Sequence, residues 1–544
     1  MTLIAGRAAL SCLGFGPPCA AARLSQSAAL ATVVLVPTIK LGERPLDLAA
    51  LVALSVRGSR VALSTNTKQR VYRSRQVVES AVATGATLYG INTGFGKLAG
   101  VRIPDEQLAL LQRNLLLSHA TGVGDALPQA TSRLAFALRI HNLALGYSGV
   151  RMQLLEQAMA LFNHDLVPVI PSQGSVGASG DLAPLSHMAL PLIGFGNVHD
   201  GTRVISGKAA LVKAGRKPLA LREKEGLALI NGTQIMTAIG LLTLHRALLC
   251  CKAADIACAL TVEALRGSEK PFQARIHELR KHQGQSCTAQ NLRSLLHGSK
   301  VMKSHAHCAK VQDAYSLRCA PQVHGASKDG VRYAHNVLLT EANSVTDNPL
   351  VFTNGDVVSG GNFHGQPVSQ AMDFLKIAVS TLANISERRI EQMVNPDISG
   401  LPPFLAKHPG LESGFMIPQV VAASLASENK SLAHPASVDT IPTSANREDH
   451  VSMGVTAARH ADMVVYNTAK VLGIELLCAA QGIDLGESLA PGKGVAVAHK
   501  AVRARVKGLE GDRYLAPDLK AAELLILDGS LVIAVEAAVG ELAI

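Results

Sequence analysis

Two long proline-free stretches constrain the fold of this chain more than any other feature. Residues 233–265 and 446–483 contain no proline, and both are apolar over much of a helical circumference. A helix that is apolar nearly all round must be buried against several other helices, from the same chain or from another subunit. The two stretches therefore predict a bundle of long helices, and we expect the protein to be a homo-oligomer.

Two further segments have the spacing of amphipathic helices. Residues 104–116 begin with a proline and two acidic side chains, which suit the first turn of a helix. Residues 367–395 end before Pro396 and repeat apolar side chains at helical spacing. Strand signals occur only at residues 33–36 and 356–358, so the predicted fold class is mainly α. The apolar side chains of the segment before Pro396 are Val368, Met372, Leu375, Val379 and Leu382.

The composition indicates a packed protein without a nucleic-acid platform. Of the 544 residues, 48% are hydrophobic and 17% are charged, which is too apolar for a disordered chain. Seven tyrosines, eleven phenylalanines and no tryptophan are too few rings for a surface that stacks single-stranded bases. We therefore expect a core of Leu, Ala, Val and Ile, and no nucleic-acid partner.

The net charge of +11 lies mostly in residues 1–75, which hold ten basic and two acidic residues. The densest basic run, residues 68–75, is expected to form a solvated helix face, and a phosphate-binding patch is the alternative.

The nine cysteines show neither a disulfide framework nor a CxxC pair, which fits a reducing compartment. The tightest possible metal cluster, residues 304–308, lacks a second ligand pair at a suitable spacing, so no metal is expected. No apolar run reaches the roughly 18 residues that a membrane span needs, and no membrane partner is expected.

The first 35 residues contain no acidic side chain and are rich in Ala, Ser and Leu. This composition overlaps with that of organellar transit peptides, and a disordered extension or a misassigned start is the alternative. We expect the protein to be cytoplasmic.

A glycine-rich segment, residues 174–185 (GSVGASGDLAPL), carries the strongest chemical signal. Three glycines in seven residues indicate a backbone that turns tightly or approaches another group closely. The segment lacks the Lys-Ser/Thr ending of a phosphate-binding P-loop. Neither Ser175 nor Ser179 has the Gly-x-Ser-x-Gly spacing of a nucleophile elbow. An ordinary loop and a self-modifying loop are the two remaining interpretations.

Self-modification has a chemical basis in Ala178, Ser179 and Gly180. The Gly180 amide nitrogen has no side chain beside it and can reach back to the Ala178 carbonyl in a tight turn. Loss of water from the new ring and from the Ser179 hydroxyl would leave a methylidene-imidazolone, a strong electrophile made from backbone atoms.

With seven other segments, residues 174–185 resemble the aromatic amino-acid ammonia-lyase family. The resemblance spans roughly residues 36–520, and the first 35 residues have no counterpart. It implies a mostly helical homotetramer whose active sites are each assembled from three subunits, with the methylidene-imidazolone of residues 178–180 as the only cofactor. The seven other segments are residues 89–96, 117–119, 231–234, 312–319, 359–364, 427–430 and 446–453.

The resemblance implies roles for several residues in the reaction. Tyr89 would be the base that takes the β-proton, or would lie beside it, and Tyr315 would assist at the electrophile. A tyrosine near its usual pKa of about 10 is a poor base at neutral pH, so nearby positive charge or hydrogen-bond donors must lower it. Arg318 would provide this charge and would clamp the substrate carboxylate with two hydrogen bonds.

The remaining expected site residues would hold the substrate. Asn231 would donate to the electrophile's oxygen or to the carboxylate, Gln312 would be a supporting donor, and Phe363 would form an apolar wall. His119 and Glu428 have the hydrogen-bonding chemistry to hold an imidazole ring.

Two features favour L-histidine as the substrate and urocanate as the product. His364 stands where lyases acting on aromatic amino acids more often have Gln, and residues 448–450 (EDH) precede Val451. A tyrosine or phenylalanine lyase, an aminomutase and a catalytically silent scaffold are the alternatives. Ala314 and Ala320 replace the more usual Pro and Gln of the family, which could loosen the loop that carries Tyr315.

The expected domain organisation is linear. An N-terminal extension (1–35) precedes an N-terminal domain with the Ala-Ser-Gly electrophile (36–230), a central long-helix bundle (231–510) and a C-terminal helical segment (511–544).

Overall fold

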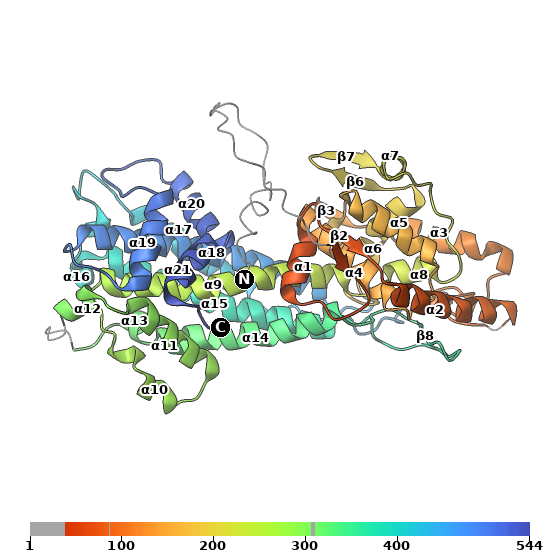
Figure 1. Cartoon of the computed structure of the whole chain (residues 1–544), viewed down its shortest axis with the longest axis horizontal. Coiled ribbons are helices and arrows are strands. Elements are labelled where there is room, and N and C mark those ends of the chain that lie inside the picture. Colours follow the sequence, from red (N-terminus) through yellow and green to blue (C-terminus); the bar gives the residue numbers. More distant parts are fainter. Residues whose placement is uncertain (1–37, 86, 306–310) are drawn as a thin grey trace. The chain divides into compact units, whose positions relative to one another are not determined.

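The computed structural model describes residues 38–85, 87–305 and 311–544, and these are mainly helical, as predicted (Figure 1). The expected N-terminal extension and the expected strand at residues 33–36 lie outside the described residues, as does part of the 304–308 cluster.

The four longest helices are α9 (Gln234–Ala264), α14 (Ala320–Ala342), α15 (Gln366–Val394) and α18 (Gly454–Leu485). Helices α9 and α15 follow the predicted bounds within a few residues. The predicted helix at 446–483 is wrong at its start, because Asn446 and Met453 have φ values of +63° and +55°. A right-handed helix cannot contain such residues, so α18 begins only at Gly454.

The chain forms two compact units, each made from three separated stretches. Among the described residues, those up to 241 and those in 339–367 and 439–455 form the first unit, and those in 242–338, 368–438 and 456–544 form the second. The expected linear boundaries near residues 230 and 510 fall inside the first and second unit, respectively.

Short strands in the first unit form small, separate sheets. Strands β4, β6 and β7 form a three-stranded antiparallel sheet, and the other strands pair in twos. The predicted strand at 356–358 is confirmed by β9. The strands are β1 (Thr38–Lys40), β2 (Arg60–Ala62), β3 (Val123–Ala126), β4 (Leu166–Pro168), β5 (Pro171–Gln173), β6 (Asn197–Asp200), β7 (Arg203–Ser206), β8 (Leu350–Val351) and β9 (Val357–Val358).

Helix α4 forms the centre of the first unit, since nearly all of its residues are buried. The predicted helix at 104–116 is confirmed by a 3₁₀ turn at Asp105–Gln107 followed by α3. The helices of this unit, besides the start of α9 and the end of α14, are α1 (Leu48–Ser55), α2 (Thr65–Ala83), α3 (Leu108–His119), α4 (Gln129–Ala144), α5 (Met152–Asn163), α6 (Leu182–Ala189), α7 (Gly207–Lys213) and α8 (Glu225–Ile230).

The basic run at residues 68–75 lies in α2, but it is not a solvated face throughout. Arg75 is buried, and its guanidinium donates to Glu79 and Glu223 at 2.8 and 2.7 Å. The expectation is wrong at this residue because the side chain links α2 to the segment before α8.

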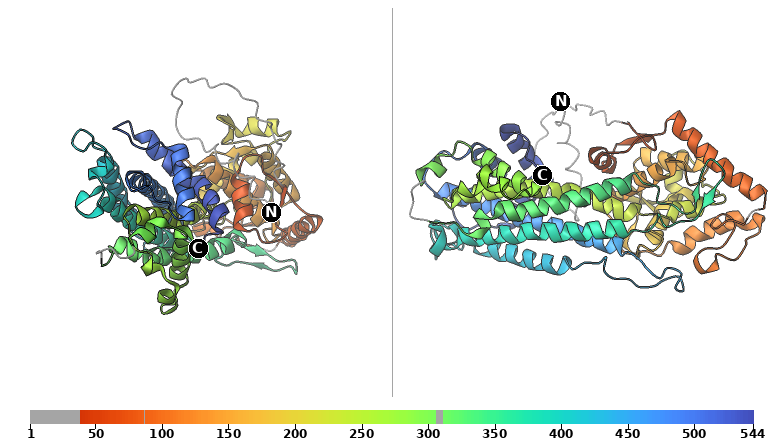
Figure 2. Two further views of the ribbon diagram at one scale, coloured as in Figure 1. Left: turned by 60° about the vertical axis from the view of Figure 1, so that its left-hand side comes forward. Right: turned by 90° about the horizontal axis from the view of Figure 1, so that it is seen from below.

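Most of α9, α14, α15 and α18 lies in the second unit, where these helices run side by side (Figure 2). Buried charges join them: Arg389 of α15 forms two hydrogen bonds with Glu475 of α18, at 2.5 and 2.8 Å. The other helices of this unit are α10 (Ala274–Glu278), α11 (Gln283–Leu296), α12 (Lys300–Ser304), α13 (Tyr315–Arg318), α16 (Pro396–Ser399), α17 (Met416–Leu432), α19 (Lys493–Arg505), α20 (Ala516–Leu527) and α21 (Ser530–Val539).

Among the described residues, α18 alone is long and apolar enough to cross a membrane by length and composition. Its most apolar window is 83% buried within the structure, as expected for a core helix. The helix passes this test with charged and polar residues among apolar ones, so it is not the uninterrupted apolar run considered in the sequence.

Candidate active site

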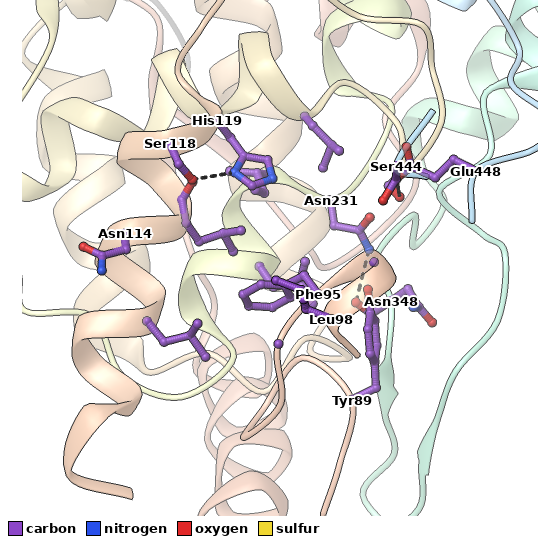
Figure 3. A pocket seen from close by; sticks show the side chains of 18 of the residues that line it. Tyr89, Phe95, Leu98, Asn114, Ser118, His119, Asn231, Asn348, Ser444 and Glu448 are labelled. Atoms are coloured by element: carbon purple, nitrogen blue, oxygen red, sulfur yellow. Dashed lines mark hydrogen bonds between the residues drawn. The ribbon is translucent and has the colours of Figure 1, made fainter. Parts of the chain in front are cut away.

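A pocket of about 710 Å³ lies within the first unit (Figure 3). Its wall combines the loop after α2, helix α3, the loop before α6 with the start of that helix, helix α8 and three loops from later parts of the chain. Five of the eleven expected site residues line it: Tyr89, His119, Ser179, Asn231 and Phe363.

The loop of Ala178, Ser179 and Gly180 adopts a backbone that requires glycine. Gly180 has a φ of +76° and forms a β-bridge with Gly232. A Cβ on Gly180 would lie 2.0 Å from the Gly232 carbonyl oxygen. A side chain at Gly180 is therefore excluded both by the left-handed backbone and by contact.

Asp181 fixes this loop to the start of α9. Its Oδ2 accepts hydrogen bonds from the backbone N–H groups of Ile235 (2.9 Å) and Met236 (3.0 Å), and its Oδ1 accepts from Ser175 Oγ (3.1 Å). Burial raises the Asp181 pKa to about 7, although these hydrogen bonds act in the opposite direction. The loop is thus held on both sides, by Gly232 and by α9.

Glu448 is the acidic side chain of the pocket wall. Its Oε1 accepts a hydrogen bond from Ser179 Oγ at 3.2 Å, and its Oε2 accepts from Thr443 Oγ1 at 2.6 Å. Glu448 lies in a segment that resembles the family, yet the expected site residues did not include it. The signal that could have identified Glu448 is its position in residues 448–450, since that tripeptide favours histidine as the substrate.

Glu428, the carboxylate expected to hold the ring, lies elsewhere. It belongs to α17 in the second unit, where it accepts a hydrogen bond from Asn467 Nδ2 at 2.9 Å. Glu428 is exposed on α17 and does not line the described pocket of its own chain, so one chain alone does not bring it to the ring-binding position.

His119 ends helix α3 and points toward the pocket (Figure 3). Its Nδ1 lies 3.0 Å from Ser118 Oγ. Burial lowers the His119 pKa below its usual value of 6.5, and a backbone hydrogen bond to Leu115 and the charge of Glu448 oppose this only in part. The ring is therefore neutral at pH 7, with one nitrogen able to accept a hydrogen bond.

Tyr89 differs from the expectation of a lowered tyrosine pKa. Burial raises the pKa of its hydroxyl above 10, and the charge of Glu448 adds to this, whereas a backbone hydrogen bond from Gly96 lowers it. No Lys or Arg is among the described residues that line the pocket, so this part of the wall offers no cation to stabilise a phenolate.

Asn231 follows α8 and points its amide toward neighbouring main chain. Its Nδ2 donates to the Asn348 carbonyl at 3.1 Å and to Asp347 Oδ1 at 3.3 Å. The main-chain carbonyl of Asn231 accepts a hydrogen bond from the buried Arg139 guanidinium at 3.0 Å. The Asn231 backbone and side chain are thus both anchored.

Tyr315, Gln312 and Arg318 lie in the second unit and do not line the described pocket. The Tyr315 side chain is 70% exposed, and the Arg318 guanidinium lies over its ring at 4.6 Å from the centroid. One chain therefore leaves this tyrosine–arginine pair at its surface.

The loop carrying Tyr315 is held despite the replacement of proline. Ala314 has a φ of −62°, close to the value that proline would impose. The Ser316 carbonyl accepts from Arg389 at 3.3 Å, and Ser316 Oγ accepts from Gln392 Nε2 at 2.9 Å.

His364 and His450, which favoured histidine as substrate, pack against each other. Their rings stack at 5.7 Å with an interplanar angle of 7°, and His364 Nε2 donates to the His450 carbonyl at 3.2 Å. The pair links the loops that carry Phe363 and Glu448. No group of three or more potential metal ligands occurs in the described parts of the chain.

Comparison with known proteins agrees with this geometry. The family model for aromatic amino acid lyases matches residues 46–504. A histidine ammonia-lyase from Sorangium cellulosum (strain So ce56) is 54% identical over 509 residues, which cover 92% of this chain and 99% of that protein. One from Symbiobacterium thermophilum is 52% identical, over 91% of this chain and 98% of the relative.

Solved structures show the same fold. The crystal structure of histidine ammonia-lyase from Trypanosoma cruzi matches with a TM-score of 0.86 and 42% identity, over 92% of this chain and 95% of that one. Tyrosine aminomutase from Streptomyces globisporus matches with a TM-score of 0.87 and 37% identity, over 93% and 100%. The chain belongs to the aromatic amino acid lyase family. It is an enzyme of the ammonia-lyase type.

Proposed function

We propose that the protein eliminates ammonia from L-histidine without oxidation and releases urocanate. The observation that carries this proposal is the pairing of a neutral His119 with the carboxylate of Glu448 in one largely apolar pocket. A neutral imidazole can donate from one ring nitrogen and accept at the other, and a carboxylate accepts from a ring N–H, so the two side chains can match the one donor and one acceptor of a neutral imidazole ring, which a phenyl ring lacks. The names of the relatives at 54% and 52% identity support the same substrate.

We propose that Ala178, Ser179 and Gly180 become a methylidene-imidazolone. The residues fit this group, because Gly180 has no side chain in the way and the Ser179 hydroxyl, which must leave, lies 3.2 Å from the Glu448 carboxylate. When formed, the group supplies the electrophile that activates either the amino group for departure or the β-proton for removal.

In the proposed reaction, Tyr89 takes the β-proton as a general base. Its raised pKa within one chain means that a cation must approach before the phenolate forms readily. Asn231 orients the amino-acid end of the substrate, and Phe363 forms an apolar wall.

We infer that the working enzyme is a homotetramer in which other subunits complete each site. The surface position of Tyr315, with Arg318 stacked on its ring, supports this proposal. Arg318 of another subunit would clamp the substrate carboxylate and supply the cation that Tyr89 needs, with Tyr315 and Gln312 alongside.

The proposed function is tested by incubating the full chain separately with L-histidine, L-tyrosine and L-phenylalanine. Urocanate and ammonia should form from histidine, with far slower reaction of the other two. Preferential formation of a cinnamate or of a β-amino acid would assign the enzyme to an alternative within its family.

A further inference from the structure

Two charged side chains are completely buried behind the pocket wall. Lys224 and Asp347 are 0% and 1% exposed, and Lys224 Nζ lies 2.6 Å from Asp347 Oδ2. The reaction proposed above gives neither residue a role. Burial of two charges costs about as much free energy as their mutual attraction returns, so such a pair is weak evidence for stability.

The backbone of Lys224 adds a second cost. Its φ is +72°, in the left-handed region that glycine adopts easily and a side chain disfavours. Glycine would fit this position without strain but has no ammonium group to reach Asp347. Lys224 thus occupies a backbone conformation that disfavours a side chain, and its ammonium group contacts the Asp347 carboxylate.

The second oxygen of Asp347 faces residues of the pocket wall. Oδ1 accepts a hydrogen bond from the Asn348 N–H at 2.7 Å and one from Asn231 Nδ2 at 3.3 Å. Asn231 and Asn348 both line the pocket, and the Asn231 amide also donates to the Asn348 carbonyl (Figure 3). One carboxylate therefore neighbours Lys224 on one side and a pocket amide on the other.

The same carboxylate contacts residues at both ends of helix α8. Lys224 is the N-cap of this six-residue helix and Asn231 is its C-cap. Leu227 and Ile230 of α8 also line the pocket. Asp347 thus joins the residues at the two ends of the helix that, with its C-cap Asn231, contributes three residues to the wall.

We propose that Asp347, with its charge balanced by Lys224, is a positioning residue that fixes the Asn231 side chain in the pocket. The inference rests on the proposed function, in which Asn231 orients the substrate. Loss of the Asp347 oxygen removes one of the two acceptors that hold the Asn231 amide, so the amide can rotate away from its working orientation.

Two matched double variants test this proposal. Lys224→Met with Asp347→Asn removes both charges but keeps an acceptor oxygen near Asn231, whereas Lys224→Met with Asp347→Leu removes the charges and the oxygen. We expect the first to keep nearly native kcat/KM for L-histidine. The second should lose roughly tenfold to a hundredfold, the range associated with a misplaced contacting group. Similar kcat/KM values for the two variants would overturn the proposal.

A third substitution separates positioning from general damage to the fold. In an Asn231→Ala background the two double variants should have the same kcat/KM, because the group that Asp347 positions is gone. An equally large loss from the Leu variant in that background would mean that Asp347 acts through the fold, and would overturn the proposal.

Failure of the proposed function is recognised separately. If the native protein forms no urocanate, crystal structures of the two double variants still test the positioning. The Asn231 amide should keep its orientation in the Asn variant and lose it in the Leu variant. An unchanged orientation in both would contradict the inference.

Discussion

Among single residues, we expect His119 and Glu448 to determine substrate choice. Both lie in a pocket whose other walls are largely apolar, and burial keeps His119 neutral at pH 7. Buried groups that hold a polar ring lose their partners when an apolar ring enters, which can discriminate by several powers of ten. Phenylalanine should therefore be a very poor substrate.

Replacing His119 with Leu should change the specificity of the enzyme. The variant removes one partner of the imidazole, so kcat/KM for histidine should fall while that for phenylalanine stays level or rises. Arg318→Lys is the control, because loss of the two-pronged carboxylate contact should weaken both substrates together. If kcat/KM falls equally for both substrates in His119→Leu, His119 does not select the ring.

The same substitution, Glu to Gln, shows which of Glu448 and Glu428 binds the substrate ring. Glu448→Gln removes the charge of the pocket carboxylate and should lower histidine turnover strongly. Glu428→Gln alters a residue of α17 that accepts a hydrogen bond from Asn467 of α18, and it should have the smaller effect. The measurement is kcat/KM for each variant beside its thermal midpoint, and the reverse order would restore Glu428 as the ring-binding residue.

His141 should make the stability of the first unit depend on pH. Burial lowers the pKa of this histidine to about 4, and its Nδ1 accepts a hydrogen bond from the Gly42 N–H at 3.0 Å. Between pH 6.5 and about 4, His141 is protonated in the unfolded chain but neutral in the folded chain. The free energy of unfolding should therefore fall as pH falls through this window.

His141→Gln keeps an acceptor for the Gly42 N–H but does not titrate. Denaturant unfolding at pH 7 and pH 5 should show a smaller pH effect in this variant than in the native protein. Equal pH effects in the two proteins would mean that His141 is not responsible.

At the scale of elements, the loop of residues 178–180 links backbone geometry to chemistry. If it cyclises, the intact protein should weigh two waters less than its sequence. Gly180→Ala would bring a Cβ to 2.0 Å from the Gly232 oxygen, so the loop cannot keep its shape. We expect this variant to show the unmodified mass and no turnover, and Ser179→Ala, which lacks the leaving hydroxyl, to behave in the same way with its fold retained.

The elements also show what a sequence can predict. Helices α9 and α15 are long enough for their apolar periodicity to mark them within a few residues. The short strands of the first unit are two to four residues long, and β3 and β4 pair with strands distant in the sequence, so they carry little local signal. The start of α18 was misjudged because the left-handed residues before it form a loop that carries Glu448.

The site could be predicted only in part, because some of its residues meet only when the chain folds. The segments that resemble the family identified Tyr89, His119, Ser179, Asn231 and Phe363 of the pocket. They did not identify Glu448, because its place in the pocket depends on which loop returns to the Ser179 hydroxyl, and the role of Glu428 stays a prediction. The Lys224–Asp347 pair was also missed, since its members are 123 residues apart and meet only in the folded chain.

For the whole molecule, we expect each active site to combine residues of more than one subunit. Ser179 and Tyr315 lie in different compact units, and Tyr315 is exposed on its own chain. If they act in one site from different subunits, inactive Ser179→Ala and inactive Tyr315→Phe proteins should complement each other when expressed together. Restored urocanate formation in the mixed oligomer is the expected result, and a mixture as inactive as its parents would mean that each site uses both residues of one chain.

The release of ammonia from L-histidine by the native protein tests the central claim most directly. Ammonia and urocanate, measured together over time, should appear in equal amounts and at equal rates, because one elimination produces both. Consumption of histidine without ammonia, with formation of its β-amino isomer, would contradict the account, and so would the absence of any reaction.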